Sequence, residues 1–240
     1  MNSVKAVFKK QIKDTYHNTA TLVQFIIFPA VAFAMTHFVA RSHDFEGPET
    51  MFITMMSAAF VGMALVPFVA GIIAEDREQK SLRFLVMAGV KPPGYLLGIG
   101  GVVFVTGLFP ALAFSLMGRF SGQQFGLFMA VFMSGVVASI LLGLTIGVFA
   151  GNPQAATGLA MPIAMVLGFG PMISPFNETI ERVFSIFYTQ QLNVVMDSFH
   201  VIDGYRPDVN LGQSFAIIGA NIGVLIVLFV VAFAKKGLKG

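Results

Sequence analysis

The chain has 240 residues, of which 56% are hydrophobic and only 11% are charged, and its mean hydropathy is +0.80. Soluble domains are typically about 45–50% apolar and about 25% charged. The 15 basic and 12 acidic side chains cannot cover a soluble particle of this size. The composition excludes a soluble globular protein and a disordered one, and leaves an integral membrane protein. Because the chain has no cysteine, a disulfide scaffold and a thiolate metal site are also excluded.

Six apolar stretches are long enough to cross a membrane as helices, which takes roughly 20 mostly apolar residues. They run over residues 22–40, 51–74, 96–117, 127–150, 158–174 and 214–234, and none contains Asp, Glu, Lys or Arg. The apolar runs are continuous, whereas strands of a membrane β-barrel alternate apolar and polar residues. The sequence predicts an all-α integral membrane protein, with six transmembrane helices in a single domain over residues 1–240.

Lysine and arginine are concentrated on one side of this topology. The N-terminal segment, the second connection and the C-terminal tail hold 11 of the 15 basic residues. The other four are Arg41, Arg119, Arg182 and Arg206. Because basic residues favour the cytoplasmic side in short connections, we expect both termini to be cytoplasmic.

Two segments outside the spans have helical apolar patterns. In residues 1–20, one predicted helical face carries Val4, Val7, Phe8, Ile12 and Tyr16, and four lysines occupy the other faces. This pattern predicts an N-terminal interfacial (elbow) helix on the inner leaflet. A more specific interpretation is that this helix also contacts a cytoplasmic partner. Residues 175–213 predict one or two external amphipathic helices on, or dipping into, the outer leaflet.

The fourth span carries a ridge of small residues with a period of four. Its members are Gly135, Ser139, Gly143, Gly147 and Gly151. Small residues at this spacing let helices approach closely. The ridge indicates either tight packing within one bundle or a sliding or dimer surface. Prolines inside four spans, at positions 29, 67, 110 and 162, favour kinked helices.

Several function classes lack their expected residues. Ion-coupled carriers usually hold charged groups inside spans, and none is present here, which disfavours a secondary carrier or channel. No catalytic motif or paired catalytic groups support an intramembrane enzyme, and the four histidines have no metal-ligand spacing. No P-loop is present either. If the chain performs work, its energy must therefore come from another chain.

The connection over residues 75–95 is the most informative segment. Charged residues Glu75–Glu78 are followed by a short apolar helical pattern, which Gly89 and Pro92-Pro93 can end. An apolar helix framed by charge indicates a surface on which another protein docks. A helix lying in the lipid interface is the alternative.

This segment is similar to the connection between the second and third spans of type-2 ABC transporter permeases. The resemblance is carried by Asp76-Arg77-Glu78-Gln79-Lys80-Ser81-Leu82-Arg83-Phe84-Leu85, then Pro92 or Pro93, then Tyr95-Leu96-Leu97-Gly98. The topology also matches, with an N-terminal interfacial helix, six spans and an amphipathic external segment. Family members usually have Gly at the position of Lys80 and often Glu at that of Arg83, so this chain departs from the pattern there.

The resemblance implies that the short helix is a cytoplasmic coupling helix, seated on a separate ATP-binding subunit. The contact residues implied by position are Glu75, Arg77, Glu78, Ser81, Leu82, Leu85 and Val86, with Asn152 and Gln154 in a smaller second contact. The first three would form ion pairs, and the leucines and Val86 would fill a groove. ATP and Mg²⁺ would bind to that partner, and no cofactor or metal to this chain.

The resemblance further implies a non-catalytic permease subunit of an ABC exporter, working with a second, identical or different permease half. We expect a multi-pass protein of a bacterial plasma membrane, with no nucleic-acid partner. The apolar, Phe- and Met-rich spans favour amphipathic or hydrophobic cargo, such as a peptide, a drug-like molecule or a lipid-linked molecule. A membrane sensor or immunity partner of the same fold, which moves no cargo, stays open as an alternative.

Overall fold

The computed structural model describes residues 3–42, 47–79, 92–199 and 209–236, and within these ranges the regular structure is entirely helical. Ser3–His17 forms α1, which precedes the first span. The spans are built from α2 (Thr19–Met35) with η1 (Thr36–Ala40), α3 (Met51–Ala59) with η2 (Phe60–Ala64) and α4 (Leu65–Glu78), α6 (Pro92–Met117), α7 (Gln123–Phe149), α8 (Pro153–Ile173) with η3 (Ser174–Phe176), and α11 (Leu211–Lys236). Six helices are long and apolar enough to cross a membrane, which confirms the predicted number of spans.

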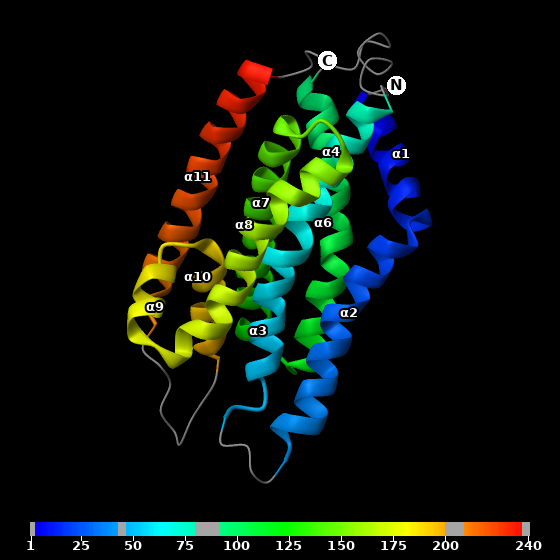
Figure 1. Cartoon of the computed structure of the whole chain (residues 1–240). Coiled ribbons are helices and arrows are strands. Elements are labelled where there is room, and N and C mark those ends of the chain that lie inside the picture. The colour runs from blue at the N-terminus through cyan, green and yellow to red at the C-terminus, as the bar shows by residue number, and fades with distance from the viewer. Residues whose placement is uncertain (1–2, 43–46, 80–91, 200–208, 237–240) are drawn as a thin grey trace.

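The second and fourth spans form the centre of the bundle (Figure 1). In the most apolar 18-residue stretch of the second span, 72% of the positions are buried, and in that of the fourth span 61% are buried. The corresponding share in the first and sixth spans is only 17%. Aromatic rings fill the interior, and the ring of Phe60 stacks on that of Phe132 with centroids 6.1 Å apart. Phe114 and Phe128 are fully buried beside them. The outermost spans therefore remain open to lipid or to other chains.

The second span is interrupted by a π-helical turn at Phe60–Ala64, three residues before Pro67. A π turn leaves carbonyls in irregular positions, and a carbonyl inside a membrane needs a donor. Gln24 of α2 supplies one, because its Nε2 donates to the Ala64 carbonyl over 3.2 Å. The polar Gln24 is thus explained by the backbone of a neighbouring span. Helices α2, α6 and α8 continue through Pro29, Pro110 and Pro162.

The small-residue ridge of α7 faces other helices of the same bundle. A Cβ atom on Gly135 would lie 2.7 Å from Leu192, one on Gly143 would lie 2.8 Å from the Val66 carbonyl oxygen, and one on Gly147 would lie 2.9 Å from that of Ala70. Ser139 donates to the Val61 carbonyl over 2.6 Å. Gly151 is different, since no neighbour lies within 4 Å of its Cβ position. Four of the five residues therefore pack within one chain.

The external segment forms two short helices with different surroundings, α9 (Glu178–Phe184) and α10 (Tyr188–Asp197). No residue of α9 is buried, as expected for a helix at a surface. Eight of the ten residues of α10 are buried, so α10 lies inside the bundle and not on the leaflet. Two of its polar side chains bond to the spans: Tyr188 bonds to Ser139 over 2.8 Å, and Gln190 accepts from Ser174 over 2.9 Å.

Helix α1 docks on α6, at the end of the bundle that also carries the end of α11 (Figure 1). Its buried face agrees only in part with the predicted one, since Val7 is buried and Phe8 and Ile12 are partly buried. Val7, Gln11 and Thr15 are buried, whereas Tyr16 is 62% exposed. Val7 packs tightly on α6, where a Cβ on Gly98 would lie only 2.6 Å from it. Polar Gln11 and Thr15 are turned inward as well.

Candidate functional site

The end of α4 is where the apolar span meets the charged connection, and Asp76 lies on its buried side. Val69, Ile73 and Asp76 are spaced i, i+4 and i+7, so the carboxylate continues the face that packs into the bundle. The Asp76 residue is 6% exposed. A carboxylate at this depth needs partners, because an unpaired buried charge is costly.

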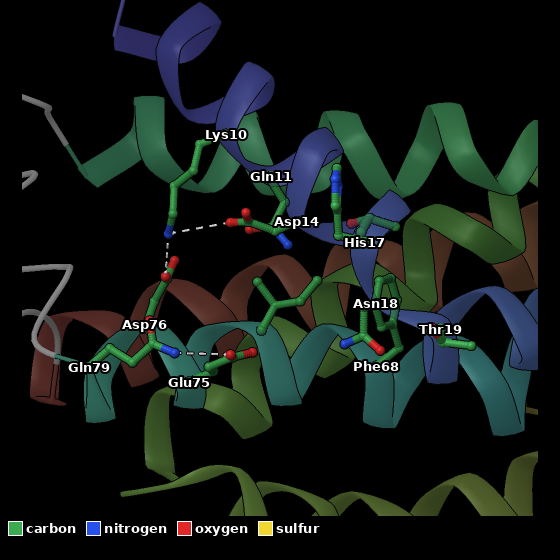
Figure 2. A pocket seen from close by; sticks show the side chains of 12 residues that line it. Lys10, Gln11, Asp14, His17, Asn18, Thr19, Phe68, Glu75, Asp76 and Gln79 are labelled. Atoms are coloured by element: carbon green, nitrogen blue, oxygen red, sulfur yellow. Dashed lines mark hydrogen bonds and ion pairs between the residues drawn. The ribbon is translucent and has the colours of Figure 1, made fainter.

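Two side chains from distant parts of the chain satisfy Asp76. Lys10 Nζ of α1 donates to Oδ1 over 2.7 Å, and the Tyr95 hydroxyl of α6 donates to Oδ2 over 2.6 Å. Figure 2 shows Lys10 reaching across from α1 to Asp76 and Asp14. Hydrogen bonds to a charged group are shorter and stronger than neutral ones. One carboxylate thus ties α1, α4 and α6 together.

Arg77, the next residue, binds a different part of the bundle. Its Nη1 donates to the Val148 carbonyl over 2.5 Å and lies 3.3 Å from the Ala150 carbonyl. These carbonyls lie at the C-terminal end of α7, where backbone acceptors have no partners within the helix and where a cation is favoured by the helix dipole. Arg77 therefore caps α7. We refer to Lys10, Asp76, Arg77 and Tyr95 as the basal cluster.

The turn between α7 and α8 is adjacent to this cap. Asn152 is the N-cap of α8, since its Oδ1 accepts from the Ala155 amide over 2.8 Å, and Pro153 follows at the first helical position. Asn152 and Gln154 are both exposed. Arg77 thus joins the two regions for which a partner contact was predicted, the end of α4 and the α7–α8 turn.

The other predicted contact residues divide into two groups. Glu75 and Glu78 are exposed, and Glu75 Oε1 accepts from Gln79 over 3.0 Å. Both carboxylates are accessible to a partner, whereas Arg77 is engaged within the chain. Ser81, Leu82, Leu85 and Val86 lie outside the described residues, as does most of the predicted coupling helix.

Three members of the basal cluster were not singled out from the sequence as site residues: Lys10, Asp76 and Tyr95. The position of Asp76 on the apolar stripe of α4 was a usable signal. Lys10 was grouped with the lysines near lipid, and nothing in its local sequence indicates a partner 66 positions away. In the described part of the chain, no group of three or more His, Asp or Glu residues could hold a metal ion.

Six helices long and apolar enough to cross a membrane, with a buried charged cluster at one end of the bundle, define a multi-pass membrane protein. A family model described as "ABC-2 family transporter protein" matches residues 49–234. The match covers well over half of the chain, so the protein belongs to this family and is a membrane permease of an ABC transporter. The resemblance inferred from residues 76–98 is confirmed. Helices α1 and α2 precede the matched region. No curated protein matches the chain.

Proposed function

We propose that this chain is the membrane subunit of an ATP-driven exporter, and that a separate ATP-binding subunit docks on residues 75–95. ATP and Mg²⁺ would be bound by that partner. The observation that carries the proposal is the basal cluster, which ties both ends of the docking segment to the rest of the bundle.

The connection between docking and movement follows from these bonds. Residues 80–91 join α4 to α6, and the two flanks meet where Tyr95 donates to Asp76. A force on the segment would act on α4 and α6 together. It would reach α1 through Lys10 and the end of α7 through Arg77. Motion of an ATP-binding subunit would thus be transmitted to three spans and α1 at once.

A second permease half would complete the pathway, as the family resemblance implies. The first and sixth spans have the surface for such a partner, because only 17% of the most apolar 18-residue stretch of each is buried. On α11, Gly219 and Gly223 have no neighbour within 4 Å of their Cβ positions, and Val224 and Val227 beside them are exposed. Small residues on an open helix face support close helix association. The second half would be either an identical or a different chain.

The proposed cargo is amphipathic or hydrophobic. An apolar cavity of about 910 Å³ opens between α1, α6, α7 and α11, and its lining includes Phe104, Ile140 and Phe229. A cavity of this size and character suits a drug-sized apolar molecule. The expected location is a bacterial plasma membrane with both termini in the cytoplasm, which the placement of α1 and the end of α11 at one end of the bundle supports.

Copurification tests the proposed partner. We expect the full chain to copurify with an ABC-type ATP-binding subunit, and Leu82→Asp or Leu85→Asp to abolish recovery. Thr179→Asp is the matched control, because it adds the same carboxylate to exposed α9 at the other end of the bundle. Retention of the ATPase by both leucine variants would contradict the proposed docking segment.

A second measurement tests transmission separately from docking. Asp76→Asn keeps the shape of the side chain but removes its charge and weakens its bond to Lys10. We expect the variant to bind the ATPase normally and to hydrolyse ATP, with less cargo moved per ATP in proteoliposomes. An unchanged transport-to-hydrolysis ratio would exclude a transmitting role for Asp76.

A further inference from the structure

A second feature lies beside the basal cluster, a cavity of about 760 Å³ between α1 and α4. Its walls come from the inward face of α1 and from the side of α4 that carries Glu75 and Gln79 (Figure 2). The volume falls within the range of small-molecule sites. Glu75 is also a predicted contact of the ATPase, but the other residues that line the cavity are not among the predicted docking contacts.

The charges around the cavity are unequal. Three carboxylates line it, those of Asp14, Glu75 and Asp76, against the single lysine Lys10. Lys10 is bonded to Asp76 at 2.7 Å and lies 3.9 Å from Asp14. The lining therefore carries a net negative charge. Such a site favours a ligand with a positively charged group.

Buried polar groups of α1 also line the cavity. The Thr15 residue is 5% exposed, and its hydroxyl has no hydrogen-bond partner anywhere in the described ranges. The Gln11 residue, one turn earlier, is 7% exposed and lines the same cavity. The Thr15 hydroxyl oxygen is fully covered by protein atoms, so of these two groups the Gln11 amide is the one left to bond to a ligand in the cavity.

The cavity also has an apolar part. Phe68 and Ile72 of α4 line it. Ile72 lies one turn before Asp76 and Phe68 lies two turns before Glu75, toward the interior of the span. A ligand that fills it must therefore be charged where it meets the carboxylates and apolar where it meets Phe68. This change of polarity occurs where a membrane helix leaves the hydrocarbon, which is the depth of lipid headgroups.

We propose that this cavity binds the headgroup of an aminophospholipid of the phosphatidylethanolamine type. Its primary ammonium donates to the Asp14 and Glu75 carboxylates. Its phosphate oxygens accept from the Gln11 amide, and its chains leave past Phe68 and Ile72. A quaternary choline group has no N–H to donate, and an anionic headgroup without an amine is repelled by the carboxylates.

Native mass spectrometry of the full-length chain, after removal of copurified lipid, tests the assignment. The probes are phosphatidylethanolamine, phosphatidylcholine and phosphatidylglycerol with identical acyl chains. We expect retention of a phosphatidylethanolamine adduct in preference to the other two. Equal retention of phosphatidylcholine or phosphatidylglycerol would overturn the proposal. Equally tight binding of water-soluble phosphoethanolamine would overturn the assignment to a membrane lipid.

Three variants place the binding at the cavity. Glu75→Gln and Asp14→Asn each remove a charged acceptor, and each should weaken phosphatidylethanolamine binding about tenfold. Asp14 has a 54% exposed side chain, so its variant is expected to fold. Glu78→Gln is the matched control, because Glu78 is an exposed carboxylate on the same helix and does not line the cavity. Similar lipid affinity in all of these variants would refute the site.

Gln11→Leu distinguishes a ligand contact from a packing defect. The substitution keeps a side chain of similar bulk and removes the amide. With phosphatidylethanolamine, we expect a smaller rise in Tm than for the parent. An equal lipid-dependent rise in Tm for both proteins would contradict the contact.

Discussion

The docking of α1 on α6 can be tested by adding a single methyl group at Gly98. The new Cβ would lie 2.6 Å from Val7 Cγ1 and 2.8 Å from Val7 Cβ, which is closer than real Cβ contacts. Overpacking of this kind typically costs about 1–3 kcal/mol, while replacing Gly by Ala inside a helix returns up to about 1 kcal/mol. We therefore expect Gly98→Ala to lower the free energy of unfolding by up to about 2 kcal/mol.

Gly101→Ala is the matched control on the same helix, against the same partner. Its Cβ would lie 3.5 Å from a ring carbon of Phe8, which is ordinary contact. This control should therefore show only the gain in helix propensity, up to about 1 kcal/mol. The two alanine variants should thus change stability in opposite directions when unfolding is followed in detergent.

Cysteine labelling separates undocking of α1 from general destabilisation. The chain has no cysteine, so Thr15→Cys creates a single thiol at a position that is 5% exposed. We expect a maleimide to label this thiol slowly in the parent and in the Gly101→Ala background, and faster in the Gly98→Ala background. If the two glycine variants have equal stability and equal labelling rates, the packing of α1 on α6 described above is refuted.

Three further predictions concern other parts of the bundle. Arg77→Gln should lower unfolding stability by about 1–2 kcal/mol, because the α7 carbonyls lose a charged donor, whereas Glu78→Gln, at an exposed position, should have little effect in the same melt. Gly143→Ala should be severely destabilising, since its Cβ would lie 2.8 Å from a backbone oxygen. Gly151→Ala, where the added Cβ meets open space, should melt like the parent. Equal melting temperatures for these two variants would refute the ridge contact. Burial raises the pKa of Asp197 from 3.8 to about 6. As pH rises, the unfolded chain therefore releases this proton at a lower pH than the folded chain does. The free energy of unfolding should fall by roughly 3 kcal/mol in total as pH rises from about 4 to above 6. Asp197→Asn should flatten that part of the pH–stability profile, and an unchanged slope would exclude Asp197 as its source.

The spans could be predicted from the sequence because crossing a bilayer imposes a local requirement. Each of the six must be long and apolar by itself, whatever its neighbours are. The predicted 22–40 and 51–74 therefore agree closely with the observed Leu22–Ala40 and Met51–Glu78, and the second span extends only through its charged end.

The surroundings of α10 could not be predicted in the same way. An amphipathic pattern is satisfied equally by a leaflet surface or by a groove inside a protein. What selects the groove is the complementary surface on α7, where Gly135 leaves space for Leu192 and Ser139 bonds to Tyr188. These pairs are separated by about 50 positions or more, and no local pattern links them. The same reason applies to Asp76, whose partner Lys10 lies 66 positions away.

The burial of α10 has a consequence for the order of assembly in the membrane. Its polar side chains bond to residues of the second, fourth and fifth spans, including Thr54, Ser139 and Ser174. Polar groups have no such partners in bare lipid, so α10 can enter its place only after these spans have come together. Contacts this far apart in sequence form late because their loop-closure entropy must be offset first. We therefore expect folding of this end of the bundle to finish with α10, and a chain arrested before that step to leave a polar helix outside an incompletely filled interior.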